Sequence, residues 1–218
     1  MLTHSEENYL KTIHHLSEET NKSVSTNAIA DKLSTKAASA TDMVQKLAAK
    51  GFASYYKYKG VRLTDKGTKE ALKVVRKHRL WEVFLVKKLN FKWDEVHEIA
   101  EQLEHIKSPM LIERLDEHLG FPKFDPHGDP IPNREGIMAA TKQLLLSELA
   151  IGNSGIITAV KDGNTAFLQY LEKIGAFIGA ELQVLDKVEF DDSLEVSING
   201  KPAQFISKEA SQNILITE

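Results

Sequence analysis

The N-terminal part of the chain changes from helical to alternating periodicity in an order that few folds accommodate. Apolar residues recur at helical spacing over residues 4–19, a short helix is predicted after Ser25, and a third helix is predicted over residues 38–50. Residues 52–64 then alternate apolar and polar side chains around a Lys-Gly turn, which is typical of a two-stranded ribbon. Helix, turn, helix and ribbon in this order predict a winged helix-turn-helix.

Basic residues are concentrated in the same part of the chain. Residues 21–80 contain 14 Lys or Arg against 4 Asp or Glu, although the whole chain carries a net charge of −3. A basic block joined to an acidic remainder is typical of a polyanion-binding module attached to a second function. On charge alone, a lysine-rich solvated surface explains the pattern equally well.

The second helix of a helix-turn-helix, here the one predicted over residues 38–50, enters the major groove of DNA. Small and hydroxyl side chains can contact thymine methyl groups or phosphates, and cations hold the phosphates. Some winged helices act only as protein–protein modules, but the excess of basic residues here favours DNA. We predict contacts from Lys36, Ala38, Ser39, Thr41, Asp42, Gln45 and Lys46 on the helix and from Lys57, Lys59 and Arg62 on the ribbon.

A helical region is predicted after the ribbon, with helices over residues 68–89, 94–106 and 109–119. Apolar residues lie on more than one face of these helices. A dimerisation unit is therefore plausible, because one winged helix usually binds half of a two-fold site. Residues 120–133 are rich in Gly, Pro and Asp, which predicts an ordered loop or linker.

Metal-binding residue types share one face of the predicted helix 94–106. At about 100° per residue, His97, Glu101, Glu104 and His105 project to one side, and apolar residues project to the other. His78 and Glu82 stand one turn apart in the preceding helix. Nitrogen and oxygen ligands from two neighbouring helices suit a divalent first-row metal. A solvated amphipathic face is the alternative interpretation for helix 94–106 alone.

The last third of the chain changes to short alternating runs. Asn199-Gly200 stands between two of them and is a strong hairpin signal. Five strands and one helix predict a small barrel. The strands are predicted over residues 156–160, 182–185, 194–198, 203–206 and 214–217, and the helix over residues 165–174.

Composition excludes several classes of protein. The chain has no cysteine, so neither a disulfide framework nor a thiolate metal site can form. No apolar run approaches the roughly 20 residues that a membrane-spanning helix needs. The N-terminus lacks the basic start and apolar stretch of a signal peptide. We therefore expect a cytoplasmic protein without a membrane partner.

Several local motifs together resemble one family, the metal-dependent transcriptional repressors of the diphtheria toxin repressor and manganese transport regulator type. The resemblance rests on residues 7–13, 43–47, 58–67 and 76–82, on Val96-His97 and Glu104-His105, and on the Pro-Ile-Pro linker at 130–132. It implies a mainly α fold with a β C-terminal domain. The expected domains are a winged helix-turn-helix (1–65), a helical metal-binding and dimerisation domain with linker (66–140) and an SH3-like, FeoA-like small barrel (141–218).

The resemblance also implies a function and a set of ligands. Members of the family are cytosolic homodimers that bind a double-stranded DNA operator when Mn²⁺ or Fe²⁺ draws the N-terminal residues onto the helical domain. Residue by residue, the primary site would use Asn8, Glu101, Glu104 and His105, and an ancillary site His78, Glu82 and His97. Asp125 and His127 match an acid and a histidine that some members add.

The metal and the switch depend on a few of these positions. Glu101 stands where iron-type members carry cysteine and manganese-type members carry glutamate, and harder carboxylate ligands favour Mn²⁺, with Fe²⁺ as the alternative. Asn8 replaces an Asp or Met of the family, and Lys11 replaces the Glu of binuclear members, and this replacement argues against a paired manganese centre.

Two other functions compete with a metal-activated repressor. A winged-helix regulator that has lost metal control is one, and Asn8 and Lys11 are the evidence for it. A metalloenzyme is the other, because His and Glu around an open metal can activate water. Every candidate carboxylate is already needed as a ligand, however, and no catalytic triad or phosphate-cradling motif is visible. We therefore expect no enzymatic activity.

Overall fold

The computed structural model describes residues 2–20, 23–56, 59–138 and 142–217. Contacts divide the chain into two compact units. The first consists of Met1–His78, Gln102–Pro109 and Pro132–Met138, and the second of Arg79–Glu101, Met110–Ile131 and Ala139–Glu218.

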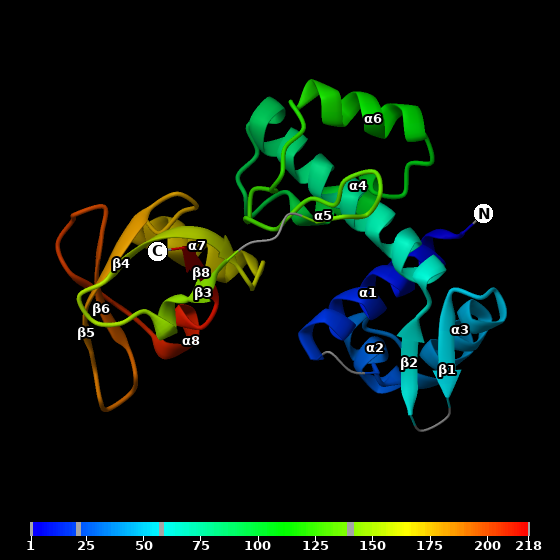
Figure 1. Cartoon of the computed structure of the whole chain (residues 1–218), viewed down its shortest axis with the longest axis horizontal. Helices are drawn as coiled ribbons and strands as arrows, with labels where there is room; N and C mark the ends of the chain where they lie inside the picture. The colour runs from blue at the N-terminus through cyan, green and yellow to red at the C-terminus, as the bar shows by residue number, and fades with distance from the viewer. Residues whose placement is uncertain (1, 21–22, 57–58, 139–141, 218) are drawn as a thin grey trace. The chain divides into compact units, whose positions relative to one another are not determined.

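The first unit contains the predicted winged helix (Figure 1). Its elements are α1 (His4–Thr20), α2 (Thr26–Lys32), α3 (Ala37–Ala49), β1 (Ala53–Tyr56), β2 (Gly60–Leu63) and the first part of α4 (Asp65–Leu89). The two strands pair antiparallel, with Ala53 opposite Leu63 and Tyr56 opposite Gly60. Apolar side chains from all three helices and both strands form its core, among them Leu10, Ile29, Val44, Leu47 and Val61, each 0% exposed. The prediction of helix, turn, helix and ribbon is confirmed.

Gly51 ends α3 in the left-handed backbone conformation that glycine adopts readily. Its φ is +75°. The amide of Gly51 donates to the carbonyl of Ala48 at 2.9 Å, and the amide of Phe52 donates to that of Leu47 at 3.0 Å. This pair of bonds satisfies the last carbonyls of the helix. The chain can therefore turn directly from α3 into the ribbon.

Helix α4 begins at Asp65, three residues earlier than predicted. The hydroxyl of Thr64 accepts a hydrogen bond from the amide of Gly67 at 3.1 Å, so Thr64 caps the helix. A Cβ atom at position 67 would lie 1.9 Å from the carbonyl oxygen of Phe52. Glycine is required there because the start of α4 packs directly on the backbone before the ribbon.

Helix α5 is shorter than predicted, spanning His97–Leu103 instead of residues 94–106. A turn precedes the helix: the amide of Lys92 donates to the carboxylate of Glu95, and the amide of Glu95 donates to the carbonyl of Lys92. After it, the amide of Ile106 reaches the carbonyl of Leu103, and the Ser-Pro step at 108–109 disfavours further helix. Glu104 and His105 therefore lie in the turn after the helix. The prediction that one helical face carries all four metal-binding residues is wrong.

The second unit contains the remainder of α4, most of α5, α6 (Pro109–His118) and a six-stranded antiparallel sheet. The strand order is β3-β8-β4-β5-β6-β7. Their bounds are β3 (Leu144–Leu145), β4 (Ser154–Val160), β5 (Glu181–Lys187), β6 (Leu194–Ile198), β7 (Gln204–Ile206) and β8 (Ile214–Thr217). Three helical segments accompany the sheet, a 3-10 turn at Leu146–Glu148, α7 (Thr165–Ile174) and α8 (Lys208–Ser211). The five predicted strands are confirmed, and β3, the 3-10 turn and α8 are additions.

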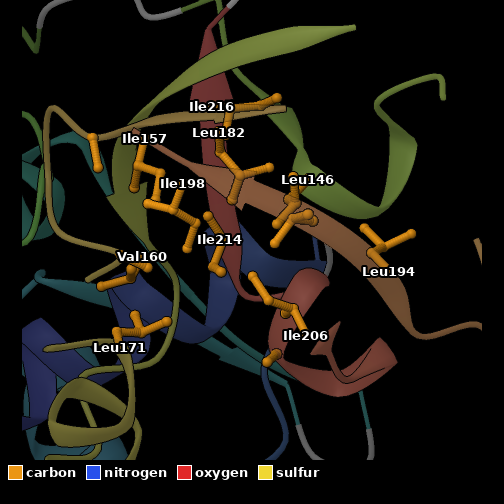
Figure 2. Packing of buried hydrophobic residues seen from close by; sticks show 14 of the residues in the cluster. Leu146, Ile157, Val160, Leu171, Leu182, Leu194, Ile198, Ile206, Ile214 and Ile216 are labelled. Atoms are coloured by element: carbon orange, nitrogen blue, oxygen red, sulfur yellow. The ribbon is translucent and has the colours of Figure 1, made fainter. Parts of the chain in front are cut away.

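One apolar cluster holds the sheet together. Figure 2 shows side chains of β4, β5, β6, β7 and β8 directed toward one another, with Leu146 and Leu171 completing the cluster. Asn199 and Gly200 form the turn between the paired strands β6 and β7, as the hairpin signal predicts. None of the helices in the described part of the chain combines the length and apolar character of a bilayer crossing.

Candidate metal centre and nucleic-acid interface

Helix α3 presents the predicted DNA-contacting residues on its solvent side. Ala40, Val44 and Leu47 are buried, and Thr41 is half-buried. The Thr41 hydroxyl donates to the carbonyl of Ala37 at 2.9 Å. The predicted contact residues that are exposed are Lys36, Ala38, Ser39, Asp42, Gln45 and Lys46. The exposed face thus combines small, amide and cationic side chains with one carboxylate, Asp42, and small, amide and cationic side chains suit a major groove.

The ribbon and the start of α3 add cationic contacts. Lys59 and Arg62 are exposed on the ribbon, and Arg62 donates to the Ser23 hydroxyl at 3.0 Å. Lys57 lies outside the described residues. The N-cap of α3 is Lys36, whose side chain makes no capping hydrogen bond. An N-terminal helix end flanked by lysine favours a phosphate.

Glu6 of α1 anchors the C-terminal end of α3. Its carboxylate is fully buried and lies 2.7 Å from the Lys50 ammonium and 3.0 Å from the Lys46 ammonium. Burial acts to raise the pKa of Glu6, but the hydrogen bonds from Lys50, the Thr3 amide and Lys46 outweigh it and lower the pKa to about 2. Lys46 is therefore held at the edge of the DNA-facing surface by an internal partner.

Glu6→Gln is expected to destabilise the first unit in a pH-dependent way. The folded-state pKa of Glu6 lies below its ordinary value of 4.5, so its stabilisation is fully present above pH 4.5 and is lost as the pH falls toward 2. Urea unfolding at pH 6 should show a loss of about 1.5–3 kcal/mol, since hydrogen bonds to charged groups contribute this much. The difference from wild type should shrink below pH 4.5. The exposed Glu135→Gln is the matched control, and an equal deficit at every pH would contradict the assignment.

A second fully buried carboxylate of the first unit belongs to Glu104, which is 0% exposed. The Lys11 ammonium of α1 lies 2.7 Å from its Oε1 and 2.8 Å from its Oε2. Nδ1 of His78 on α4 lies 2.6 Å from Oε2. One carboxylate thus joins α1, α4 and the turn after α5.

His105 is held beside Glu104 by residues of α1. Its Nδ1 lies 2.6 Å from Oε2 of Glu7, and its ring stacks on that of His4 with centroids 4.5 Å apart. A carboxylate that binds one ring nitrogen directs the other toward a metal. That other nitrogen, Nε2, lies 3.8 Å from Oε1 of Glu104.

Asn8 supplies a further oxygen in the first unit. Its side-chain Oδ1 is buried and has no hydrogen-bond partner among the described residues. Buried polar oxygens are almost always satisfied, so an orphaned one needs an explanation. An amide oxygen, a carboxylate and an imidazole form a donor set that suits Mn²⁺ or Fe²⁺. The residues present fit a divalent metal.

A second group of metal-binding residue types lies within the second unit. Glu82, Asp125 and His127 are buried, and one ligand atom of each lies within 4.8 Å of the others. Nε2 of His127 donates to the carbonyl of Trp93 at 2.8 Å, which leaves Nδ1 facing Glu82 Oε2 at 3.6 Å. Oδ1 of Asp125 accepts the amides of His127 and Asp129, which fixes the loop. A metal-binding histidine typically donates its other ring N–H to a backbone carbonyl in this way.

Electrostatics show that this second group favours positive charge. Burial raises the pKa of Asp125, and the carboxylates of Asp129 and Glu82 raise it further. Burial acts to lower the pKa of His127, but Glu82 outweighs it and, with Asp125, raises the pKa to about 9. Arg79 lies 3.4 Å from Asp125 and 3.3 Å from Asp129. The carboxylates of Glu82, Asp125 and Asp129 outnumber the guanidinium of Arg79, and this excess of negative charge suits a divalent cation.

The remaining predicted ligands are divided between the units. His97 lies 3.5 Å from Glu82 and 3.8 Å from Glu101 within the second unit, and its side chain is 60% exposed. His78 contacts Glu104 in the first unit and precedes Glu82 by one turn of α4. The assignments of Glu101 to the primary set and His78 to the ancillary set remain predictions. Sequence reasoning missed Glu7 and Arg79, whose partners are distant in sequence.

Comparisons with known proteins cover nearly the whole chain. Residues 1–61 match the iron dependent repressor N-terminal DNA binding domain, residues 64–133 the iron dependent repressor metal binding and dimerisation domain, and residues 144–218 the FeoA domain. Iron-dependent repressor IdeR of Mycobacterium leprae is 32% identical over 159 residues, covering 70% of this chain and 69% of that protein.

Solved structures extend the similarity to the full length. A manganese-dependent transcriptional repressor in complex with manganese is 36% identical, with a TM-score of 0.88 over 97% of this chain and 98% of that one. A probable metal transport system membrane protein of Chlamydia trachomatis is 49% identical over 72 residues, and the match covers 33% of this chain but 16% of that protein. That last match therefore bears on one part of the chain alone.

Proposed function

The chain belongs to the iron-dependent repressor family of metal-activated DNA-binding proteins, and we propose that it represses transcription as a homodimer whose operator binding requires Mn²⁺. The observation that carries the proposal is the meeting of α1 with the turn after α5, where Lys11 binds Glu104 and Glu7 binds His105. Helix α1 also carries Asn8, whose buried Oδ1 has no hydrogen-bond partner among the described residues. Fe²⁺ is the alternative metal. The protein would act in the cytoplasm. The genes that it regulates would be those of metal-ion homeostasis.

The ligands of the first unit connect metal binding to the DNA-facing helix. Asn8 lies on α1, and α1 also carries Glu6, which binds Lys46 and Lys50 at the end of α3. When bound, a divalent cation would supply the positive charge that joins the α1 oxygen to Glu104 and His105. Glu7 orients the imidazole, and Glu6 transmits the position of α1 to α3.

The oxygen-rich donor set supports Mn²⁺ as the metal. The chain has no cysteine, so no thiolate is available to favour a softer ion. The second group, Glu82, Asp125 and His127, would hold another ion near His97. Calorimetric titration of the apoprotein with Mn²⁺, and anaerobically with Fe²⁺, tests this proposal. Two ions per chain with Mn²⁺ are expected, and the absence of Mn²⁺ binding would contradict it.

DNA binding is supported by the exposed face of α3 and by the basic residues around it. A homodimer should select a palindromic duplex from a randomised pool when Mn²⁺ is present. Sequencing the selected pool would identify the operator. A pool enriched equally in chelator would contradict metal activation, and a pool without two-fold symmetry would contradict the dimer.

Glu7→Ala is expected to weaken Mn²⁺ binding by about 10- to 100-fold, the usual effect of removing a partner that orients a ligand histidine. The Glu7 carboxylate is the group that holds His105 Nδ1 at 2.6 Å. Calorimetry measures the change. Glu18→Ala, on the same helix but paired with His14 instead, is the control. Equal affinities for the two variants would show that Glu7 has no part in orienting His105.

A further inference from the structure

The first unit contains a buried ion pair at the proposed metal site. Lys11 is 9% exposed and Glu104 is 0% exposed, and the ammonium reaches both carboxylate oxygens at 2.7 and 2.8 Å. Asn8 precedes Lys11 by three residues, so both side chains stand on the same side of α1. The same side of α1 therefore carries the buried amide oxygen of Asn8 and the ammonium that binds Glu104.

A buried carboxylate must be compensated by a positive charge. An isolated ion in a protein interior is strongly disfavoured, and removing one partner of a buried pair leaves the other uncompensated. The Lys11 ammonium meets this need at Glu104, because it is close enough to donate to both oxygens. It therefore occupies the electrostatic position that a divalent cation would take on the same two atoms.

We propose that Lys11 is an internal counterion that stands in for the metal at Glu104 and must withdraw before the metal can bind. This proposal rests on the proposed function, because it takes Glu104 as a metal ligand. Competition with a tethered ammonium lowers the apparent affinity for any cation, so Lys11 sets the metal concentration at which the repressor responds. It also keeps α1 close to Glu104 in the metal-free protein.

Replacing Lys11 tests the competition directly. Lys11→Met keeps the length of the side chain and removes its charge, so Mn²⁺ should bind at least about tenfold more tightly by calorimetry at fixed pH. The metal-free variant should melt at a lower temperature than the wild type, whereas the Mn²⁺-loaded proteins should melt at similar temperatures. Mn²⁺ affinity that is unchanged or reduced in Lys11→Met would overturn the proposal.

Two further variants separate competition from general effects. Lys107→Met removes the same charge from an exposed residue of the first unit that donates to the Leu2 carbonyl, and its Mn²⁺ affinity should match the wild type. An equal gain in Lys107→Met would indicate a long-range charge effect and overturn the proposal. If Lys11→Met fails to fold, Lys11→Gln provides the same test. A wild type that binds no Mn²⁺ would instead overturn the proposed function.

Discussion

Glu104→Gln is expected to abolish metal-activated DNA binding. Glu104 is the fully buried carboxylate that the Lys11 and His78 side chains share, and glutamine keeps its size while losing its charge. Mn²⁺ affinity should fall by at least about 100-fold, more than the loss of an orienting partner causes. Fluorescence anisotropy with the selected duplex should show no increase in affinity at Mn²⁺ concentrations that saturate the wild type.

The double variant Glu104→Gln/Lys11→Met controls for folding. Glu104→Gln alone removes the negative charge that compensates the buried Lys11 ammonium, and breaking a buried ion pair in this way destabilises a protein by about 3–5 kcal/mol. The double variant removes both charges and should recover much of that stability without recovering metal activation. Wild-type activation by Mn²⁺ in either variant would show that Glu104 is not a ligand.

Ser39→Glu is expected to weaken DNA binding strongly while leaving metal binding unchanged. Ser39 is exposed in the first turn of α3, where an acidic side chain is favourable to the helix. The same carboxylate would face DNA phosphates and lose a contact of about 1–3 kcal/mol in each half-site. Two half-sites together predict a loss of about 100-fold in operator affinity, measured by anisotropy with Mn²⁺ present.

Ser154→Glu is the matched control for this variant. Ser154 is exposed at the start of β4 in the second unit, so the same substitution there should leave operator affinity unchanged. Calorimetry should give wild-type Mn²⁺ affinity for both variants. Operator binding by Ser39→Glu at wild-type affinity would place the DNA interface elsewhere than on α3.

Local signals predicted most of the secondary structure. β6, β8 and α7 have the predicted bounds, because alternation and helical spacing act over neighbouring residues. The start of α4 was missed although Thr64 is a recognised N-cap residue, and the two-residue β3 is too short to show any period. The bounds of α5 were wrong because side-chain bonds at Glu95 and the proline at 109 override its helical pattern.

The candidate site was only partly predictable. The resemblance predicts Glu104 and His105 as ligands, and the sequence singles out Asn8 and Lys11 as departures from the family pattern. The contact of Lys11 with Glu104 joins residues 93 positions apart, and that of Glu7 with His105 joins residues 98 apart. No spacing rule connects side chains that the tertiary fold brings together, so the counterion and the orienting carboxylate are visible only in the structure.

The central claim is that occupation of the Glu104 site by metal switches on DNA binding. Its most direct test is the affinity of the wild-type chain for the selected duplex, measured by anisotropy as Mn²⁺ is raised from a chelated solution. DNA affinity should rise by at least about 100-fold, in parallel with calorimetric occupancy of the metal sites, and salt should weaken it steeply. The same affinity in chelator and in Mn²⁺ would contradict the claim and indicate a winged-helix regulator without metal control.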